Sequence, residues 1–231
     1  MKSTGPSNGR IYRSTDGAQT WSITSCGSAH WNSVTTSSNG QYVVSCSLAN
    51  ANAVSSNYGV NWTSTALSGK MNWVSVTSSQ SGQYVACAGL TNAGIYISTN
   101  YGYGEWSLSS APLSSWAEVV MSGQGMFIYG AVVNGSIYKN SAYGLGSWSN
   151  IYAPTQNWKS LAIDQTGTFI AAGVLNGGIY ASSNGGQTFK ATEATPNQWY
   201  SIALSAPAQV NFILLLIIVI TLIITSMQYS I

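Results

Sequence analysis

Charged side chains are scarce in this sequence. Only 5% of its 231 residues are Asp, Glu, Lys or Arg, against roughly a quarter in an ordinary soluble domain. Seven basic and five acidic residues give a net charge of +2, which supplies too few cations to neutralise a run of phosphates. We therefore predict no nucleic-acid partner, and a surface covered by Ser, Thr, Asn, Gln and Gly.

Side chains that commonly carry catalysis or bind metals are also few. His30 is the single histidine in the sequence, so a Ser–His–Asp set or a zinc site is not expected. The cysteines form no CxxC pair, and small packing residues are favoured over a disulfide or a metal site: Cys26, Cys46 and Cys87. We predict no catalytic residue, no metal and no cofactor.

The sequence is rich in one repeated unit that opens on tryptophan. This residue recurs at spacings of 42, 43, 42 and 41, at Trp31, Trp73, Trp116, Trp158 and Trp199. A period this constant indicates a repeat architecture. It defines four full repeats, 31–72, 73–115, 116–157 and 158–198, flanked by partial repeats at 9–30 and 199–207.

Each full repeat contains four short segments rich in β-branched and aromatic residues, separated by Gly, Asn and Ser. This pattern predicts an all-β protein. Four strands in about 42 residues match one blade of a β-propeller, and a β-solenoid is the alternative. We predict a propeller of about five four-stranded blades over residues 9–207. The two partial repeats could close the ring as a shared blade, or the propeller could be open or incomplete.

The two ends of the chain differ from the repeats. Residues 1–8 form a polar N-terminal extension without the apolar core of a signal peptide. Residues 208–231 are apolar, and we predict a transmembrane helix over residues 210–227. No charge follows Glu193, so the side of the membrane is not determined by the sequence. The alternative is that residues 209–215 form a second strand of the last repeat.

The most specific signal lies in the turns between the third and fourth strands. These turns read STDGAQTW (14–21), SSNYGVNW (55–62), STNYGYGEW (98–106), NSAYGLGSW (140–148) and SSNGGQTF (182–189). We expect Asp or Asn to cap backbone amides, Gly to adopt a positive φ, and the aromatic residue to pack under the turn. The residues concerned are Ser14, Asp16, Thr20, Trp21, Ser55, Asn57, Gly59, Trp62, Ser98, Asn100, Gly102, Trp106, Gly144, Trp148, Ser182, Asn184, Gly186, Thr188 and Phe189.

This pattern resembles the Asp-box, or BNR, repeat Ser-x-Asp-x-Gly-x-Thr-Trp. That repeat occurs in sialidases, sortilin-type receptors, some glycoside hydrolases and a photosystem II assembly factor. The resemblance covers roughly residues 9–205 and implies a β-propeller. The copies are degenerate, because only Asp16 keeps the acid, Ala18 stands where the glycine belongs, and Ala142 has lost the acid.

The family's catalytic pattern does not transfer to this chain. Sialidases of the family hold the substrate carboxylate with three arginines and use a Tyr–Glu nucleophile pair. Arg10 and Arg13 are the only arginines, and their spacing on a strand directs them to opposite faces. Glycosidases need two facing carboxylates, for which Glu118 and Asp164 are the one pair worth testing. A structural role for both acids is favoured.

Three tyrosines in the middle of the turns are candidates for ligand contact: Tyr58, Tyr101 and Tyr143. The favoured hypothesis is a non-catalytic propeller that binds a protein or glycan and is anchored in a membrane by its C-terminus. One alternative is a glycan-binding or relict glycosidase propeller. A further alternative, from family analogy alone, is an assembly factor of a membrane complex.

Overall fold

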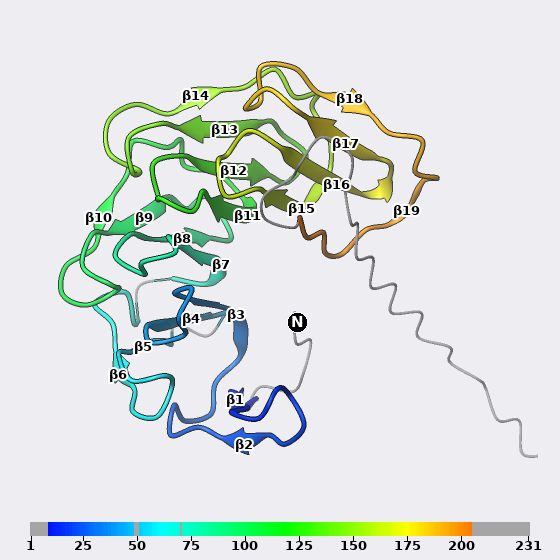
Figure 1. Cartoon of the computed structure of the whole chain (residues 1–231). Coiled ribbons are helices and arrows are strands. Elements are labelled where there is room, and N and C mark those ends of the chain that lie inside the picture. Colours follow the sequence, from blue (N-terminus) through cyan, green and yellow to red (C-terminus); the bar gives the residue numbers. More distant parts are fainter. Residues whose placement is uncertain (1–8, 49–50, 70, 205–231) are drawn as a thin grey trace, which may run out of the picture.

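The computed structural model describes residues 9–48, 51–69 and 71–204, and within them it contains strands and no helix. The all-β prediction is confirmed. The strands form five antiparallel sheets that follow one another along a curved arc (Figure 1). Within this part of the chain no helix could span a membrane. The predicted extension 1–8 and the predicted helix over 210–227 lie outside the described residues.

Four of the five sheets coincide with the four full repeats. Each contains a six-residue first strand, a buried second strand, a four-residue third strand and a two-residue fourth strand, in simple sequence order. The first sheet contains β3 (Trp31–Thr36), β4 (Val43–Ser47), β5 (Asn52–Ser55) and β6 (Thr63–Ser64), and the second contains β7 (Trp73–Ser78), β8 (Val85–Gly89), β9 (Ile95–Ser98) and β10 (Ser107–Leu108). The next two contain β11 (Trp116–Met121), β12 (Ile128–Val132), β13 (Ile137–Asn140) and β14 (Ser149–Asn150), then β15 (Trp158–Ile163), β16 (Ile170–Gly177), β17 (Ile179–Ser182) and β18 (Lys190–Ala191).

The N-terminal partial repeat makes an incomplete blade at one end of the arc. It is a two-stranded sheet of β1 (Tyr12–Arg13) and β2 (Ser22–Ile23). At the other end, β19 (Asn197–Gln198) closes the fourth full repeat by pairing with β16, and residues 199–204 of the C-terminal partial repeat contain no strand. Figure 1 shows these two ends apart, with the arc open between them. Within the described residues, therefore, the ring is not closed by a shared blade.

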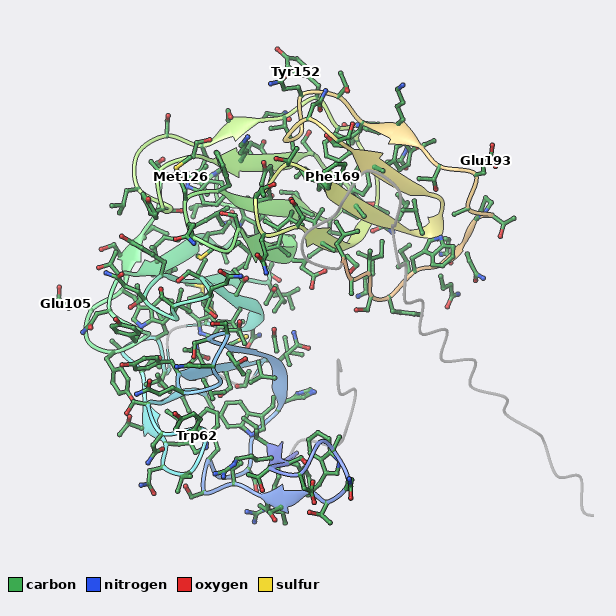
Figure 2. All side chains as sticks on the ribbon, viewed as in Figure 1. Trp62, Glu105, Met126, Tyr152, Phe169 and Glu193 are labelled. Carbon is green, nitrogen blue, oxygen red and sulfur yellow. The ribbon has the colours of Figure 1, made fainter. Side chains whose placement is uncertain are left out.

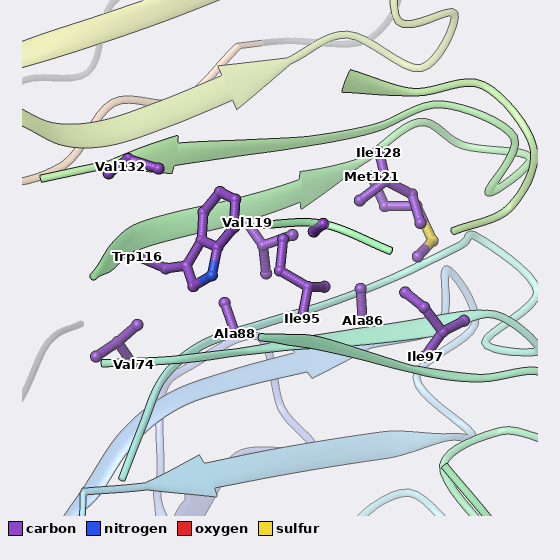
Figure 3. Close-up of a cluster of buried hydrophobic side chains, with 11 residues drawn as sticks. Val74, Ala86, Ala88, Ile95, Ile97, Trp116, Val119, Met121, Ile128 and Val132 are labelled. Atoms are coloured by element: carbon purple, nitrogen blue, oxygen red, sulfur yellow. The ribbon is translucent and has the colours of Figure 1, made fainter. Parts of the chain in front are cut away.

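The core lies between adjacent blades. Four of the five opening tryptophans are almost completely removed from solvent, because Trp73, Trp116 and Trp158 are 0% exposed and Trp199 is 5% exposed. Trp31 of the first full blade is half-buried. Figure 3 shows Trp116 and Val119 of one blade facing Ala88 and Ile95 of the blade before it. Burying an indole removes about 200 Å² of its surface from water, which contributes about 5 kcal/mol per side chain at about 25 cal/mol per Å². Stacking therefore stabilises blades that could not cover both faces alone.

Candidate functional site

The five predicted turns share one backbone geometry. In every copy the fourth and fifth residues both have positive φ: 69° and 69° at Gly17 and Ala18, and 61° and 75° at Tyr58 and Gly59. The same pair of conformations occurs at Tyr101–Gly102, Tyr143–Gly144 and Gly185–Gly186. Glycine is favoured at the fifth position because a side chain is strained there. Ala18 is therefore a strained substitute for that glycine.

The first residue of each turn holds this geometry in place. Ser55 Oγ accepts the amide of Gly59 at 3.0 Å and the amide of Asn57 at 3.3 Å. Ser98 Oγ makes the same two bonds, to Gly102 and Asn100, each at 3.2 Å. The turns that begin at Ser14 and Ser182 repeat the pattern. The serine is thus the common acceptor of two amides that the sheet ladder leaves unpaired.

The third residue closes the other side of the turn. Asp16 Oδ1 accepts the amides of Thr20 at 2.9 Å and Gln19 at 3.1 Å. Its Oδ2 accepts the Thr20 hydroxyl at 2.5 Å. The Thr20 hydroxyl first, and then the Thr20 amide and the Ser14 hydroxyl, lower the pKa of Asp16 from 3.8 to about 2. Asn57 and Asn184 accept the corresponding amides of Asn61 and Thr188 at 2.8 and 3.0 Å, so a neutral amide replaces the acid in the same capping role.

The fourth turn uses a residue that the sequence pattern did not identify. Asn140 stands at the serine position, and its Oδ1 accepts the amides of Ala142 at 2.8 Å and Gly144 at 2.7 Å. Its Nδ2 donates to the carbonyl oxygens of Leu145 at 2.8 Å and Ser147 at 3.0 Å. One longer side chain therefore replaces the serine and also closes the far side of a turn that lacks the acid. The signal was the paired change of Ser to Asn and Asp to Ala in one copy.

The aromatic residue at the end of the turn packs beneath it. The indole nitrogens of Trp21, Trp62 and Trp106 donate to the carbonyls of Ala18, Gly59 and Gly102 at 3.2, 2.9 and 3.1 Å. Trp148 Nε1 is buried and has no partner among the described residues. Phe189 fills this position in the fifth turn with no donor to satisfy. These five turns therefore have a structural role within each blade.

Two of the three candidate ligand-contact tyrosines join neighbouring blades. Tyr101 stacks on Tyr42 of the preceding blade with ring centroids 4.1 Å apart, and Tyr143 stacks on Tyr84 at 4.6 Å. Both are half-buried, whereas Tyr58 is 53% exposed. Ligand contact by these tyrosines stays a prediction.

In the fifth turn a lysine replaces the tyrosine stack. Gly185 occupies the tyrosine position, and Lys139 Nζ donates to its carbonyl oxygen at 3.0 Å. The same ammonium lies 4.7 Å from the ring centroid of Phe127, and burial lowers the pKa of Lys139. The last complete junction is therefore bridged by the hydrogen bond from Lys139 to Gly185, and the cation–π contact with Phe127 holds the lysine within its own blade.

Both candidate carboxylates accept hydrogen bonds from backbone amides. Asp164 is 3% exposed, and its Oδ1 accepts the amides of Thr168 and Phe169 in the turn between β15 and β16, at 2.8 and 3.0 Å. Glu118 is half-buried, and its Oε2 accepts the amide of Leu161 in the next blade at 2.8 Å. Each carboxylate is used in a structural hydrogen bond.

The remaining acids and the cysteines form no further site. Glu105 and Glu193 are exposed on opposite outer sides of the arc (Figure 2). Cys46 and Cys87 are buried in the same inter-blade cluster and unbridged, and burial is the main cause that raises the pKa of Cys87. Across the described ranges no group of three or more His, Cys, Asp and Glu side chains could hold a metal ion.

The surface carries a groove between the second and third full blades, near the outer rim. Its volume is about 460 Å³, and it is lined by Ile97, by residues 107–110 at and after β10, and by residues 144–147 of the fourth turn. Leu108 and Leu145 are half-exposed in it, at 53% and 51%, and serine hydroxyls surround them. The size lies within the range of ligand sites. A groove lined by both half-exposed leucines and serines suits a short peptide or a sugar.

Comparison with known proteins identifies the fold. No protein-family profile matches the sequence, and no curated protein matches it. Among solved structures, an ancestral GH74 enzyme aligns with 87% of this chain at 17% identity and a TM-score of 0.67, and the chain spans 31% of that protein. YCF48 bound to a D1 peptide aligns with 76% of this chain at 13% identity and a TM-score of 0.59, and the chain spans 59% of it.

Both of these proteins are β-propellers, and the fold of this chain is a β-propeller. The chain spans less than two thirds of either protein. At these identities the likeness extends to the fold alone.

Proposed function

We propose that this chain is a non-catalytic binding or scaffolding propeller that recognises a protein segment. The observation that carries the proposal is that the acidic side chains either bind backbone amides or lie far apart. Asp16, Glu118 and Asp164 hold backbone amides, and Glu105 and Glu193 lie on opposite outer sides of the arc. A glycosidase needs two carboxylates free to face one substrate bond, so the geometry favours recognition over hydrolysis.

The rim groove is the place where we expect the partner to bind. Leu108 and Leu145 offer apolar contact, and the hydroxyls of Ser107, Ser109 and Ser147 offer hydrogen bonds without a charge requirement. A peptide of mixed polarity satisfies both. The peptide bound to YCF48, a protein of the same fold, supports this class of ligand.

An array of short synthetic peptides tests the proposal. We expect wild-type protein to select a subset of the peptides, and Leu108→Ser and Leu145→Ser to weaken their binding about tenfold each, since each removes a half-exposed apolar contact worth 1–2 kcal/mol. Tyr152→Ser is the matched control, because Tyr152 is 86% exposed and lies outside the groove. Equal loss in all three variants, or no selected peptide, would contradict the proposal.

The glycan-binding or relict glycosidase alternative is favoured by the likeness to a GH74 enzyme. A glycan array and a panel of chromogenic glycosides separate it from peptide recognition. We expect no turnover by wild-type protein. The alternative would be established if wild-type protein turns over a glycoside and both Glu118→Gln and Asp164→Asn abolish that turnover. Circular dichroism must show that both variants are folded.

Membrane anchoring is a second part of the proposal and rests on the sequence VNFILLLIIVITLII at residues 210–224. A run of this length and apolarity suits a short membrane span. We expect the full chain to remain in the membrane fraction after alkaline carbonate washing. A chain that ends at residue 207 should be released, and release of the full chain as well would contradict the anchor. Co-purification of a membrane complex with the anchored chain would support an assembly role.

A further inference from the structure

From β3 onwards, successive units of the arc are joined by the same hydrogen bond at four junctions. A bulge follows the opening tryptophan of each first strand, and bulges re-aim the side chain beside them. The residue after the bulge accepts an amide from the first strand of the next blade. The pairs are Ser33 with Val76 at 3.2 Å, Ser75 with Val119 at 3.2 Å, Glu118 with Leu161 at 2.8 Å, and Ser160 with Ile202 at 3.0 Å.

A second series of bonds links the turns that follow the first strands. The amide of Ser38 donates to Gln80 O, the amide of Gln80 donates to Gly123 O, and the amide of Gly123 donates to Gln165 O, each at 2.8 Å. The direction of both series is constant along the arc. One face of each blade therefore offers a side-chain acceptor, and the opposite face of the next blade offers the matching amide.

The C-terminal end of the arc presents an acceptor face that no described residue of the chain pairs with. Trp199 and Ile202 are 5% and 6% exposed and pack on the last full blade. Trp199 Nε1 donates to Gly177 O at 2.8 Å. The segment 199–204 thus occupies the place of a first strand in a further blade. Ser201 stands two residues after the tryptophan, at the acceptor position of the repeat, and is exposed.

The N-terminal end presents the complementary donor face. Val34 has the repeat position of Val76, Val119 and Leu161, whose amides donate to the preceding blade. Those three residues are 5%, 1% and 2% exposed, whereas Val34 is 54% exposed. The two-stranded sheet β1–β2 covers only the outer part of this blade, where the Ser25 hydroxyl donates to Val60 O at 2.8 Å.

Exposed apolar side chains are concentrated around the same end. Besides Val34, they belong to the two-stranded sheet and its neighbouring turn: Tyr12, Trp21, Ile23, Tyr58 and Val60, at 47–59% exposure. A cluster of this kind marks an interaction surface. Of these residues, Val34 lies at the repeat position that the inner strands of a preceding blade cover in the other blades.

We propose that this face, centred on Val34, is covered by the segment 199–204 of a second copy of the chain, bound head to tail. In this contact the Val34 amide donates to the Ser201 hydroxyl of the second copy, just as the Ile202 amide donates to the Ser160 hydroxyl within one chain. The chain's own segment 199–204 is held on the last blade, across the opening of the arc from β3 (Figure 1). Each copy uses each face once, so the contact builds a ring or a filament. This inference does not depend on the ligand proposed above.

Photo-crosslinking of the full chain in detergent micelles tests the proposal. Benzoylphenylalanine is placed at position 34 in unlabelled protein, which is mixed with ¹⁵N-labelled protein that has the natural valine. We expect crosslinks from position 34 to a labelled peptide containing residues 199–204. Benzoylphenylalanine at position 113 is the control, because Leu113 is 58% exposed and lies in a middle blade. If position 34 crosslinks only to the unlabelled 199–204 peptide, the ring is closed within one chain, and this result overturns the proposal.

Sedimentation equilibrium gives an independent measurement. We expect concentration-dependent association of the wild-type chain, and Val34→Asp to raise its dissociation constant at least about tenfold, because a carboxylate would be buried without a partner. Leu113→Asp should leave the constant within about twofold of the wild-type value. A monomer at all concentrations overturns the proposal. The proposal is also overturned if Val34→Asp leaves the dissociation constant unchanged, because the apolar tail alone would produce such association.

Discussion

Replacing Trp116 and Trp158 by phenylalanine, one at a time, tests how the inter-blade core is stabilised. Both indoles are 0% exposed, and both lie edge-on to a tyrosine, with centroid distances of 5.9 Å to Tyr138 and 5.5 Å to Tyr180. They differ in one hydrogen bond. Trp116 Nε1 donates to Ala93 O at 2.8 Å, whereas Trp158 Nε1 has no partner among the described residues.

The two substitutions delete the same atoms from indoles with equal burial and similar ring contacts, so the difference between them reports mainly on the indole N–H. Trp116→Phe loses a net hydrogen-bond contribution of about 1 kcal/mol. Trp158→Phe removes a buried donor whose lack of a partner costs about 1–3 kcal/mol. We therefore expect Trp116→Phe to destabilise the fold by about 2 kcal/mol more than Trp158→Phe does, although the same atoms are deleted.

Urea unfolding followed by circular dichroism measures this difference, with the denaturant slope compared between variants. Equal slopes are required for the comparison, because stacked repeats can unfold in parts. If the two variants lose equal stability, or if Trp158→Phe loses more, then the hydrogen-bond difference between the two junctions does not control their stability, and the reasoning is refuted.

Three further predictions concern the turns. Asn140→Ala should cost about 2–3 kcal/mol in urea unfolding because two amides lose their acceptor, and Asn140→Ser should recover most of that loss. Ala18→Gly should raise the stability of the fold by about 0.5 kcal/mol in thermal unfolding, since relief of the strain at φ 69° exceeds the entropy cost of glycine. Because hydrogen bonds lower the pKa of Asp16 from 3.8 to about 2, its stabilising effect should be complete above about pH 4 and disappear as the pH falls through about 2. Asp16→Asn should flatten this part of an acid titration followed by tryptophan fluorescence, and an unchanged titration would contradict the assignment.

The blades could be predicted from the sequence because each repeat carries its own pattern. Four strands per unit were indicated by the interval between Trp73 and Trp116 and by the turns that end at Trp62 and Trp106. The structure confirms these strands. Asn140 was missed because its role depends on a side chain long enough to cross the turn. A structural role was favoured for Glu118, but its partner Leu161 in the next blade was not predicted, because the bulge that aims the side chain has no single-repeat signature. Ser33, Ser75, Glu118 and Ser160 recur two residues after tryptophan, and that recurrence was the available signal.

The arrangement of strand edges explains why association is expected at one end of the arc and not along its rim. Exposed sheet edges invite pairing with other chains, and short edge strands suppress it. Every outer edge strand here, from β6 to β18, has two residues. The inner edge strands have six, and a side chain of the preceding blade accepts an amide from β7, β11 and β15. Of the inner edges, β3 has no preceding inner strand within the described residues, and its exposed Val34 carries no charge that would repel a second chain.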